Sequence, residues 1–560
     1  MPVAETRDPF AALGGLPERV NTARYLPEMA AKAPDQMAVI AATPSGWERI
    51  TYGQLERRSN AIARGMAARG VRKGDRASLF VRPGIDLIAV TYALFKVGAV
   101  PILADPGMGR KRLVAAMRKI QPRVFVGIPL AHVARLLSPG AFKSVELPIT
   151  VGRRFAWGGP TLAQLAAADD STFECADTAA TDDAAVLFTS GSTGPPKGVV
   201  YTHGMFDAQV RALGALYDFQ PGEVDLACFP LFALFNTALE MTSVFPDLDP
   251  SRPGTCDPAR IVAAIQEHGA TSTFGSPAIW RRVVPWCQAN GVQLDTLQRV
   301  LIAGAPVPPA LIEDFRAVLP GGEVHTPYGA TESLPVASIA GSEVRELRER
   351  VEGGMGTCVG PPAPGIDMRL IAITDEPIEN VGDSTELGVR ELGEVCVRGP
   401  VVTHEYRNEP GHTRAAKMRA EDGGVWHRMG DVGYLDEEGR LWFTGRKAHR
   451  LETAKGLRMP VPSENVFNVH PDVQRTALVG VGARGEESPV LVVEPAPEHM
   501  PKTEVEHDHF LSELRNVGRK CHVTADIDTF LFHPGFPVDV RHNAKIDREV
   551  LKRWAAEQLA

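Results

Sequence analysis

The sequence predicts an α/β protein with a large N-terminal domain of helix-covered parallel sheets, a small β-rich subdomain within it, and a small α+β C-terminal domain. The chain has 560 residues, which is more than one hydrophobic core usually supports. From about residue 50, segments with helical spacing alternate with short apolar runs, a pattern typical of parallel sheets covered by helices. After about residue 390, short strands separated by turn residues replace this pattern.

The alternating part of the chain begins with a helix expected at residues 52–68, where apolar residues recur at helical spacing. Short apolar runs predict strands at residues 76–81, 100–104, 184–188, 272–274 and 300–303. Further helices are expected at residues 87–95, closed by Gly98, and at 259–267 and 277–288. Residues 342–350 are dense in charge and predict one helix with a solvated face.

The later part of the chain predicts strands at residues 393–399, 433–436 and 440–445. The polar stretch 445–450 is the expected boundary, which gives an N-terminal domain at 1–445 and a C-terminal domain at 446–560. In the latter we expect strands at 476–481 and 490–493 and a helix at 508–518. Residues 480–485 fit the dinucleotide motif G-x-G-x-x-G, but the helix that this motif requires does not follow, so we reject it.

Composition narrows the classes of function. The net charge of −8 offers no overall basic face for nucleic acid or an anionic membrane. Seven dispersed cysteines without metal-ligand spacing indicate reduced thiols. The apolar run at 87–95 is bounded by Asp86 and Lys96 and is too short to span a membrane. We therefore expect a soluble, cytoplasmic protein.

Residues 189–198 combine glycines, hydroxyl side chains and one lysine, as a loop that wraps phosphates requires. The expected phosphate ligands are Thr189, Ser190, Gly191, Ser192, Thr193, Gly194 and Lys197. The segment is no Walker A loop, because Lys197 lies between a proline and a glycine. A flexible surface linker is the alternative, but a strand pattern resumes directly after Lys197.

Five later segments supply the other parts of a nucleotide site. Backbone at Gly304, Ala305 and Pro306 can approach a flat base, and Tyr328, followed by Gly329, offers a ring for stacking. Polar side chains suited to phosphate, Mg²⁺ and ribose follow at Thr331, Glu332 and Asp431. Two further cations are Arg446, near the expected domain boundary, and Lys545, in a polar loop.

Together with residues 51–55 and 94–101, these motifs resemble those of the adenylate-forming superfamily, which contains acyl-CoA synthetases, nonribosomal-peptide adenylation domains and firefly luciferase. The resemblance covers essentially the whole chain and implies coupling of a carboxylate to ATP with release of pyrophosphate. It implies ATP and Mg²⁺ as cofactors and a mobile C-terminal domain. It also implies a catalytic set of Lys545, Thr331 and Glu332, with Glu332 as the metal ligand, Asp431 on the ribose, and Lys545 bridging the carboxylate and the α-phosphate.

Two departures from the superfamily pattern concern the acyl acceptor. Residues 230–233 read Pro-Leu-Phe-Ala where relatives often have histidine last, and residues 445–448 read Gly-Arg-Lys-Ala where relatives have a polar hinge residue last. The second change puts the domain swing that admits CoA, and hence the use of CoA, in doubt. His203, Phe232 and Ala233 are candidates for the substrate pocket, although His203 also fits a structural histidine and Phe232 a core residue.

Within the superfamily, the segments at 202–206, 326–335, 445–450 and 536–545 are most similar to the β-lactone synthetases of bacterial olefin biosynthesis. This resemblance implies ATP-dependent closure of a long-chain 2-alkyl-3-hydroxy acid to a β-lactone, and a complex with a β-lactone decarboxylase and a β-keto acid reductase. A long-chain acyl-CoA synthetase remains the alternative. An inactive scaffold is a third reading, which the joint presence of Lys197, Glu332, Asp431 and Lys545 disfavours.

Overall fold

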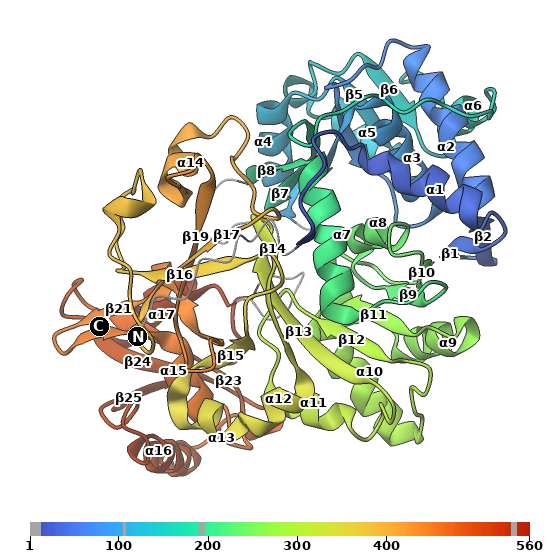
Figure 1. Ribbon diagram of the computed structural model, residues 1–560. Helices are drawn as coiled ribbons and strands as arrows, with labels where there is room; N and C mark the ends of the chain where they lie inside the picture. The colour runs from blue at the N-terminus through green and yellow to red at the C-terminus, as the bar shows by residue number, and fades with distance from the viewer. Residues whose placement is uncertain (1–12, 105–107, 190–195, 539–545) are drawn as a thin grey trace.

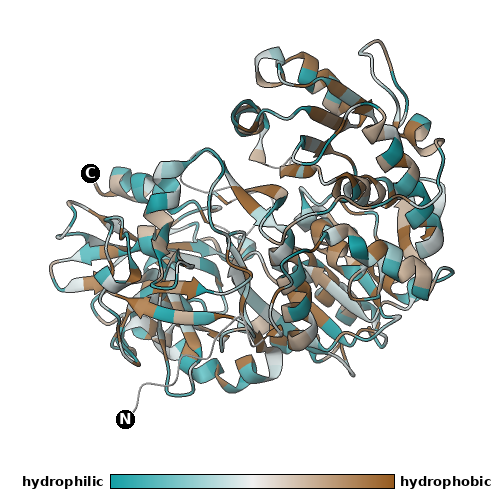
Figure 2. Ribbon diagram, turned by 45° about the horizontal axis from the view of Figure 1, so that its top comes forward, coloured by the Kyte–Doolittle hydropathy of each residue, from teal (hydrophilic) through white to brown (hydrophobic). Residues whose placement is uncertain are grey.

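The computed structural model describes residues 13–104, 108–189, 196–538 and 546–560. Two sheets with their helices form the blue and green parts of Figure 1, and three further sheets form the yellow to red part. Hydrophobic residues concentrate along the strands and on one side of many helices, as Figure 2 shows. The predicted α/β class, with a β-rich region after the parallel sheets, is confirmed.

The first sheet has six strands and is parallel except for its last pair. In spatial order its strands are β6 (Leu147–Thr150), β5 (Val124–Gly127), β3 (Arg76–Phe80), β4 (Val100–Ala104), β7 (Asp183–Thr189) and β8 (Lys197–Thr202). The helices between these strands and before them are α2 (Tyr52–Ala67), α3 (Ile85–Val97), α4 (Arg110–Ile120), α5 (Pro129–Leu136) and α6 (Leu162–Ala166).

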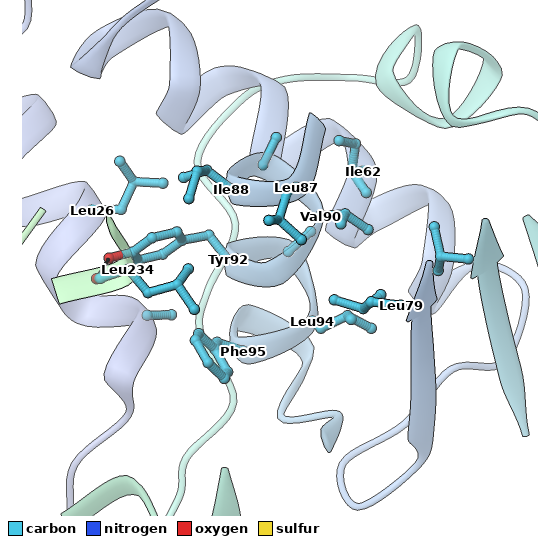
Figure 3. Close-up of a cluster of buried hydrophobic side chains, with 14 of the residues drawn as sticks. Leu26, Ile62, Leu79, Leu87, Ile88, Val90, Tyr92, Leu94, Phe95 and Leu234 are labelled. Carbon is cyan, nitrogen blue, oxygen red and sulfur yellow. Dashed lines mark hydrogen bonds between the residues drawn. The ribbon is translucent and has the colours of Figure 1, made fainter. Parts of the chain in front are cut away.

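Helix α3 explains the apolar run near residue 90, because nearly all of its side chains are buried. Leu79 and Ile62 lie on one side of it, and Leu26 and Leu234 on the other (Figure 3). Gly98 ends the helix with a φ of 75°, which favours glycine. Among the described residues, no helix is both long and apolar enough to cross a bilayer.

The second sheet has eight strands, with antiparallel pairs at its two edges and parallel strands between them. Its order is β14 (Ser333–Ala340), β13 (Glu323–Ala330), β12 (Arg299–Ile302), β11 (Ser272–Gly275), β9 (Val224–Ala227), β10 (Thr242–Phe245), β1 (Met37–Thr43) and β2 (Gly46–Thr51). The helices of this region are α1 (Tyr25–Lys32), α7 (His203–Tyr217), α8 (Ala233–Asn236), α9 (Pro258–His268), α10 (Pro277–Asn290) and α11 (Pro309–Phe315).

The prediction of one unbroken helix at residues 342–350 is wrong. Two short helices, α12 (Gly341–Glu346) and α13 (Arg348–Arg350), are separated at Leu347, whose φ of −90° and ψ of 2° leave the helical region. Leu347 is buried in one cluster with Val344 and Val351. We attribute the break to the burial of these apolar residues, which a pattern of surface charge does not reveal.

The β-rich region is a six-stranded antiparallel sheet, with α14 (Pro410–Ala416) beside it. Its strands are β15 (Thr357–Gly360), β20 (Leu441–Arg446), β19 (Val425–Leu435), β17 (Gly393–Arg398) and β16 (Asp367–Ile371), with β18 (Lys417–Arg419) paired to β19. The expected domain boundary falls at the end of β20. That these residues separate two domains stays a prediction.

After β20, the residues that the structure describes form a hairpin, a three-stranded sheet and three α-helices. These are β21 (Leu451–Thr453), β22 (Gly456–Arg458), α15 (Pro460–Phe467), β23 (Val473–Val481), β24 (Ser488–Pro495), α16 (Glu504–Arg519), β25 (Thr529–Phe532) and α17 (Arg548–Leu559). Residues 480–485 join the antiparallel strands β23 and β24, so no helix follows them, as predicted.

Candidate active site

Strands β7 and β8 bring the two ends of the predicted phosphate loop together. Thr189 and Lys197 face each other as backbone partners in the antiparallel pair. Ser190, Gly191, Ser192, Thr193 and Gly194 lie outside the described residues, so their role as phosphate ligands stays a prediction. Lys197 opens β8 and places its Nζ 5.1 Å from the centre of the Tyr406 ring, within the range of a cation–π contact.

Tyr406 links Lys197 to Glu332, and the sequence motifs did not identify it. Its hydroxyl donates to Glu332 Oε1 at 2.7 Å. Burial, followed by the nearby Glu332 carboxylate, raises the pKa of Tyr406 above its usual value. Burial lowers the pKa of Lys197, and Glu332 opposes that shift. The three side chains therefore form one electrostatic unit.

The segment that carries Tyr406 bridges two strands far apart in the sequence. Val402 pairs with Ser333, and Tyr406 pairs with Val199. The Arg407 amide also donates to the Gly198 carbonyl at 2.8 Å. Isolated bridges of this kind have no periodic sequence pattern, which is why Tyr406 gave no signal.

The turn between β13 and β14 carries Thr331 and Glu332, and its backbone is held from two directions. The Tyr201 hydroxyl donates to the Thr331 carbonyl at 2.5 Å. The Thr403 amide and hydroxyl both donate to the Glu332 carbonyl at 2.9 Å. At Gly329 a Cβ would lie 2.8 Å from the Ser333 carbonyl oxygen, so this position requires glycine. The Glu332 carboxylate is thus presented by a fixed turn.

Asp431 is held in β19 by two residues from other strands. The Tyr328 hydroxyl donates to Asp431 Oδ2 at 2.5 Å, and Arg446 Nη1 lies 3.0 Å from Oδ1. Asp431 and Arg446 are direct partners in the pairing of β19 with β20. The Asp431 charge is the main cause that raises the pKa of Arg446, and burial followed by Asp431 raises that of Tyr328. The structure thus brings together three residues predicted to bind the nucleotide.

Gly304, Ala305 and Pro306 follow the carboxyl end of β12, next to the strand that carries Tyr328. Leu301 pairs with His325 in the parallel β12–β13 ladder, so Gly304 and Tyr328 each lie three residues beyond the same pair. Gly304 has a φ of 90°, a conformation that favours glycine. These residues therefore lie at the same end of the eight-stranded sheet as Tyr328, which this sheet contributes to the Asp431 cluster (Tyr328, Asp431 and Arg446).

Lys417 is a second lysine behind the Glu332 turn that the motifs did not identify. It is buried, and its Nζ donates to the Thr403 carbonyl and, at 3.3 Å, to the Thr403 hydroxyl. Because Thr403 in turn holds the Glu332 carbonyl, Lys417 braces this turn through one intermediate residue. Burial lowers the pKa of Lys417 to about 7, and Glu332 opposes the shift.

We expect Lys417→Met to remove a pH-dependent part of the stability. The lysine has a folded-state pKa of about 7 and an unfolded value near 10.4, so between these values only the unfolded chain binds the proton. Wild-type stability should therefore rise with pH in this window, by up to about 1.4 kcal/mol per unit. Urea unfolding of both proteins near neutral and near alkaline pH measures this change. If the free energy of unfolding changed equally with pH in the wild type and the variant, the lowered pKa of Lys417 would be contradicted.

The three residues expected in the substrate pocket have different surroundings. His203 is buried, its Nδ1 accepts from the Thr22 amide at 3.1 Å, and burial lowers its pKa to about 4. These contacts account for the ring as a structural histidine, and a role toward substrate stays a prediction. Ala233 is 1% exposed within the main core. Phe232 is partly exposed and contacts Phe274 edge to face at 4.3 Å.

A magnesium site fits these residues when phosphate oxygens complete it. In the parts of the chain that the structure describes, no three His, Cys, Asp or Glu side chains gather as a metal cluster. Mg²⁺ is commonly held by one or two carboxylates together with waters and substrate phosphates. The fixed carboxylate of Glu332, beside Lys197, meets this requirement for a protein carboxylate. Lys545 lies outside the described residues, so its part in the site stays a prediction.

Comparison with known proteins identifies the family. Residues 26–407 match the family model described as AMP-binding enzyme. The chain belongs to this family. It is an AMP-forming enzyme of the adenylate-forming superfamily, as its motifs predicted.

The relatives of this AMP-binding enzyme include β-lactone synthetases, CoA ligases and an amide bond synthetase. It is 46% identical to olefin β-lactone synthetases from Xanthomonas campestris and Stenotrophomonas maltophilia, over 96% of this chain and 98% of each relative. A long-chain fatty acid–CoA ligase from Thermus thermophilus is 27% identical over 83% of this chain and 84% of its own. The amide bond synthetase McbA from Marinactinospora thermotolerans has the same fold, with a TM-score of 0.78 at 22% identity, over 97% of this chain and 99% of its own.

Proposed function

We propose that the protein converts a long-chain 2-alkyl-3-hydroxy acid to a β-lactone through an acyl adenylate, with ATP and Mg²⁺ as cofactors and release of AMP and pyrophosphate. The observation that carries the proposal is 46% identity to olefin β-lactone synthetases over nearly the full length of both chains. The fixed turn at Glu332 and the Asp431 cluster supply the charges that such a nucleotide site needs.

In the first step, a carboxylate oxygen of the substrate attacks the α-phosphorus, and the bond to pyrophosphate breaks. Lys197 and the 189–194 segment would hold the phosphates, Asp431 the ribose and Tyr328 the base. Glu332, oriented by Tyr406, would hold Mg²⁺, which neutralises phosphate charge when bound. Preorganised charge of this kind stabilises the negative charge that develops in the transition state, and Lys545 would add to it.

In the second step, the C3 hydroxyl oxygen of the substrate attacks the acyl carbon. The C–O bond to the phosphate breaks, AMP leaves, and the hydroxyl proton passes to a base or to solvent. No thiol is consumed, because nucleophile and electrophile belong to one molecule and gain from proximity. A strained four-membered ring gains less than an unstrained one.

We also propose that the enzyme works in the cytoplasm on olefin biosynthesis, in a complex with a β-lactone decarboxylase and a β-keto acid reductase. This part rests on the resemblance to the olefin-pathway enzymes. An acyl-CoA synthetase, the alternative, has support from a relative at 27% identity, against 46% for the β-lactone synthetases.

A matched pair of substrates tests the two steps separately. The 2-alkyl-3-hydroxy acid and the same acid without the 3-hydroxyl should both support exchange of labelled pyrophosphate into ATP. Only the hydroxy acid should give steady AMP release without an added acceptor. Steady AMP release from both acids at the same rate would contradict attack by the substrate's own hydroxyl.

Ala233→His should change the selectivity for substrate shape. A substrate with alkyl chains on C2 and on C3 needs room for two tails, and a small residue at a position where relatives often have histidine leaves that room. Overpacking a fitted apolar site costs about 1–3 kcal/mol, so kcat/KM for branched acids should fall by about one to two decades relative to linear 3-hydroxy acids.

The Ala233→His test compares kcat/KM for two substrates within one variant. This comparison is needed because Ala233 is buried in the core, so the substitution can also lower stability. A general loss of stability affects both substrates alike and cancels. An equal loss on branched and linear acids would mean that Ala233 lines neither tail.

A further inference from the structure

Positive charge is concentrated in one part of this acidic chain. Between Asp105 and Asp169 the sequence has ten lysines and arginines and a single acidic residue, Glu146, whereas the whole chain has 60 basic and 68 acidic residues. Among the described residues, Lys119 pairs with Glu409, and Arg123 pairs with Asp75 and Glu146. Overall composition concealed this segregation.

The same segment carries exposed large apolar side chains. On α5 and just after it, Leu130, Val133, Leu136 and Leu137 are 73%, 43%, 53% and 64% exposed, and Phe155 is 55% exposed. Leu130, Val133 and Leu137 have the spacing of one helix side. Single exposed leucines are common on proteins, but a row of them on one helix is typical of an interaction surface. We call these five side chains the apolar strip.

Cations lie at both ends of the apolar strip. At the start of α5, the His132 ring stacks on Trp157 at 5.0 Å, Trp157 contacts Phe155, and the Arg153 guanidinium lies 5.6 Å from the Phe155 ring. This places Arg153 and Phe155 beside the helix.

At the far end of α5, Arg118 of α4 approaches the turn that follows the helix. A Cβ at Gly140 would lie 4.0 Å from Arg118 Nη2. Ala131 of α5 packs against a buried cluster that contains Met117 of α4 and Ala141 of the turn, and Figure 1 shows α4 and α5 in the same lobe. Exposed apolar side chains and cations therefore occur together on α5 and in the segments that contact it.

We propose that this region docks the enzyme on an anionic lipid surface, with the apolar strip inserted among the acyl chains and the cations on the head groups. Apolar side chains at the acyl boundary and Lys or Arg at the head groups are the combination by which peripheral helices bind such surfaces. A nucleic acid would use the cations but leave the leucines exposed to water, so the strip favours lipid. The inference stands apart from the proposed reaction, and it would bring the enzyme to where a long-chain substrate partitions.

Flotation of the full-length protein with vesicles tests the proposal. Vesicles of phosphatidylcholine are compared with vesicles that also contain phosphatidylglycerol, in low and high salt. Leu130→Ser with Leu137→Ser removes two of the three apolar side chains on that helix side, and Arg153→Glu with Arg154→Glu reverses two exposed charges. Control variants on α16 are Val505→Ser, at a residue 79% exposed, and the exposed Arg515→Glu.

The wild type and both controls should bind the anionic vesicles, less in high salt, and each double variant should bind at least about tenfold more weakly. No flotation of the wild type, or equal flotation of the double variants, would overturn the proposal. The proposal would also be overturned if single-stranded RNA displaced the wild type from the vesicles and the leucine double variant bound that RNA as tightly as the wild type does. Pyrophosphate exchange by each variant confirms that the variant is folded, and this activity does not depend on whether the variant binds vesicles.

Discussion

Glu332→Gln should lower adenylate formation by about 10²–10³-fold, the usual cost of removing one preorganised electrostatic contact. The amide keeps the shape and can still accept the hydrogen bond from Tyr406, which lies at 2.7 Å in the native protein. It loses the negative charge that a hard cation prefers. The affinity for Mg²⁺ in the presence of nucleotide should therefore fall more than the affinity for AMP alone, as calorimetric titrations of both ligands can measure.

Tyr406→Phe is the matched control for this prediction. It removes the hydrogen bond to Glu332 and leaves the carboxylate, so the loss should be closer to that of one hydrogen bond, about 0.5–1.5 kcal/mol or several-fold in rate. Equal losses of Mg²⁺ and AMP affinity in Glu332→Gln would instead make Glu332 a structural residue of the turn.

Arg428→Met should destabilise the β-rich region by about 3 kcal/mol or more, because it removes the main partner of a buried charge. Arg428 Nη2 lies 2.6 Å from Glu394 Oε2, and both side chains are almost fully buried. Its guanidinium also donates to the carbonyls of Thr374 and Glu376. Lys447 remains as the other partner of Glu394, at 3.0 Å, and keeps the loss near the lower end of the range.

Arg260→Met is the control for the loss of an arginine as such. Arg260 pairs with Asp247, but both side chains are more than 60% exposed, and such pairs contribute about 0–1 kcal/mol. Urea unfolding should show a clear shift of the midpoint for Arg428→Met and almost none for Arg260→Met. Equal midpoints in the two variants would refute the importance of the buried pair.

The parts of the fold that follow a regular pattern could be predicted from the sequence. The helices α2 and α10 and the parallel strands β3, β4 and β11 agree with the apolar spacing to within two residues. The break at Leu347 could not be predicted, because it depends on which apolar side chains the core accepts. By contrast, the dinucleotide motif at 480–485 could be rejected from local evidence, because the strand that follows it is visible in the sequence.

The candidate site was predictable where its chemistry lies in compact motifs. Tyr328, Glu332, Asp431 and Arg446 were expected, and the contacts of Tyr328 and Arg446 with Asp431 agree with a shared role. Tyr406 and Lys417 were missed because their importance comes from tertiary contacts, with Glu332 in one case and Thr403 in the other. Likewise, the net charge could not reveal a basic region built from one segment.

Product analysis with and without CoA tests the central claim most directly. The enzyme is incubated with ATP, Mg²⁺ and a long-chain 2-alkyl-3-hydroxy acid, and lipids and nucleotides are identified by mass spectrometry. The proposed function predicts a β-lactone and AMP in equal amounts whether or not CoA is present. Formation of an acyl-CoA as the sole product, with no lactone, would contradict it.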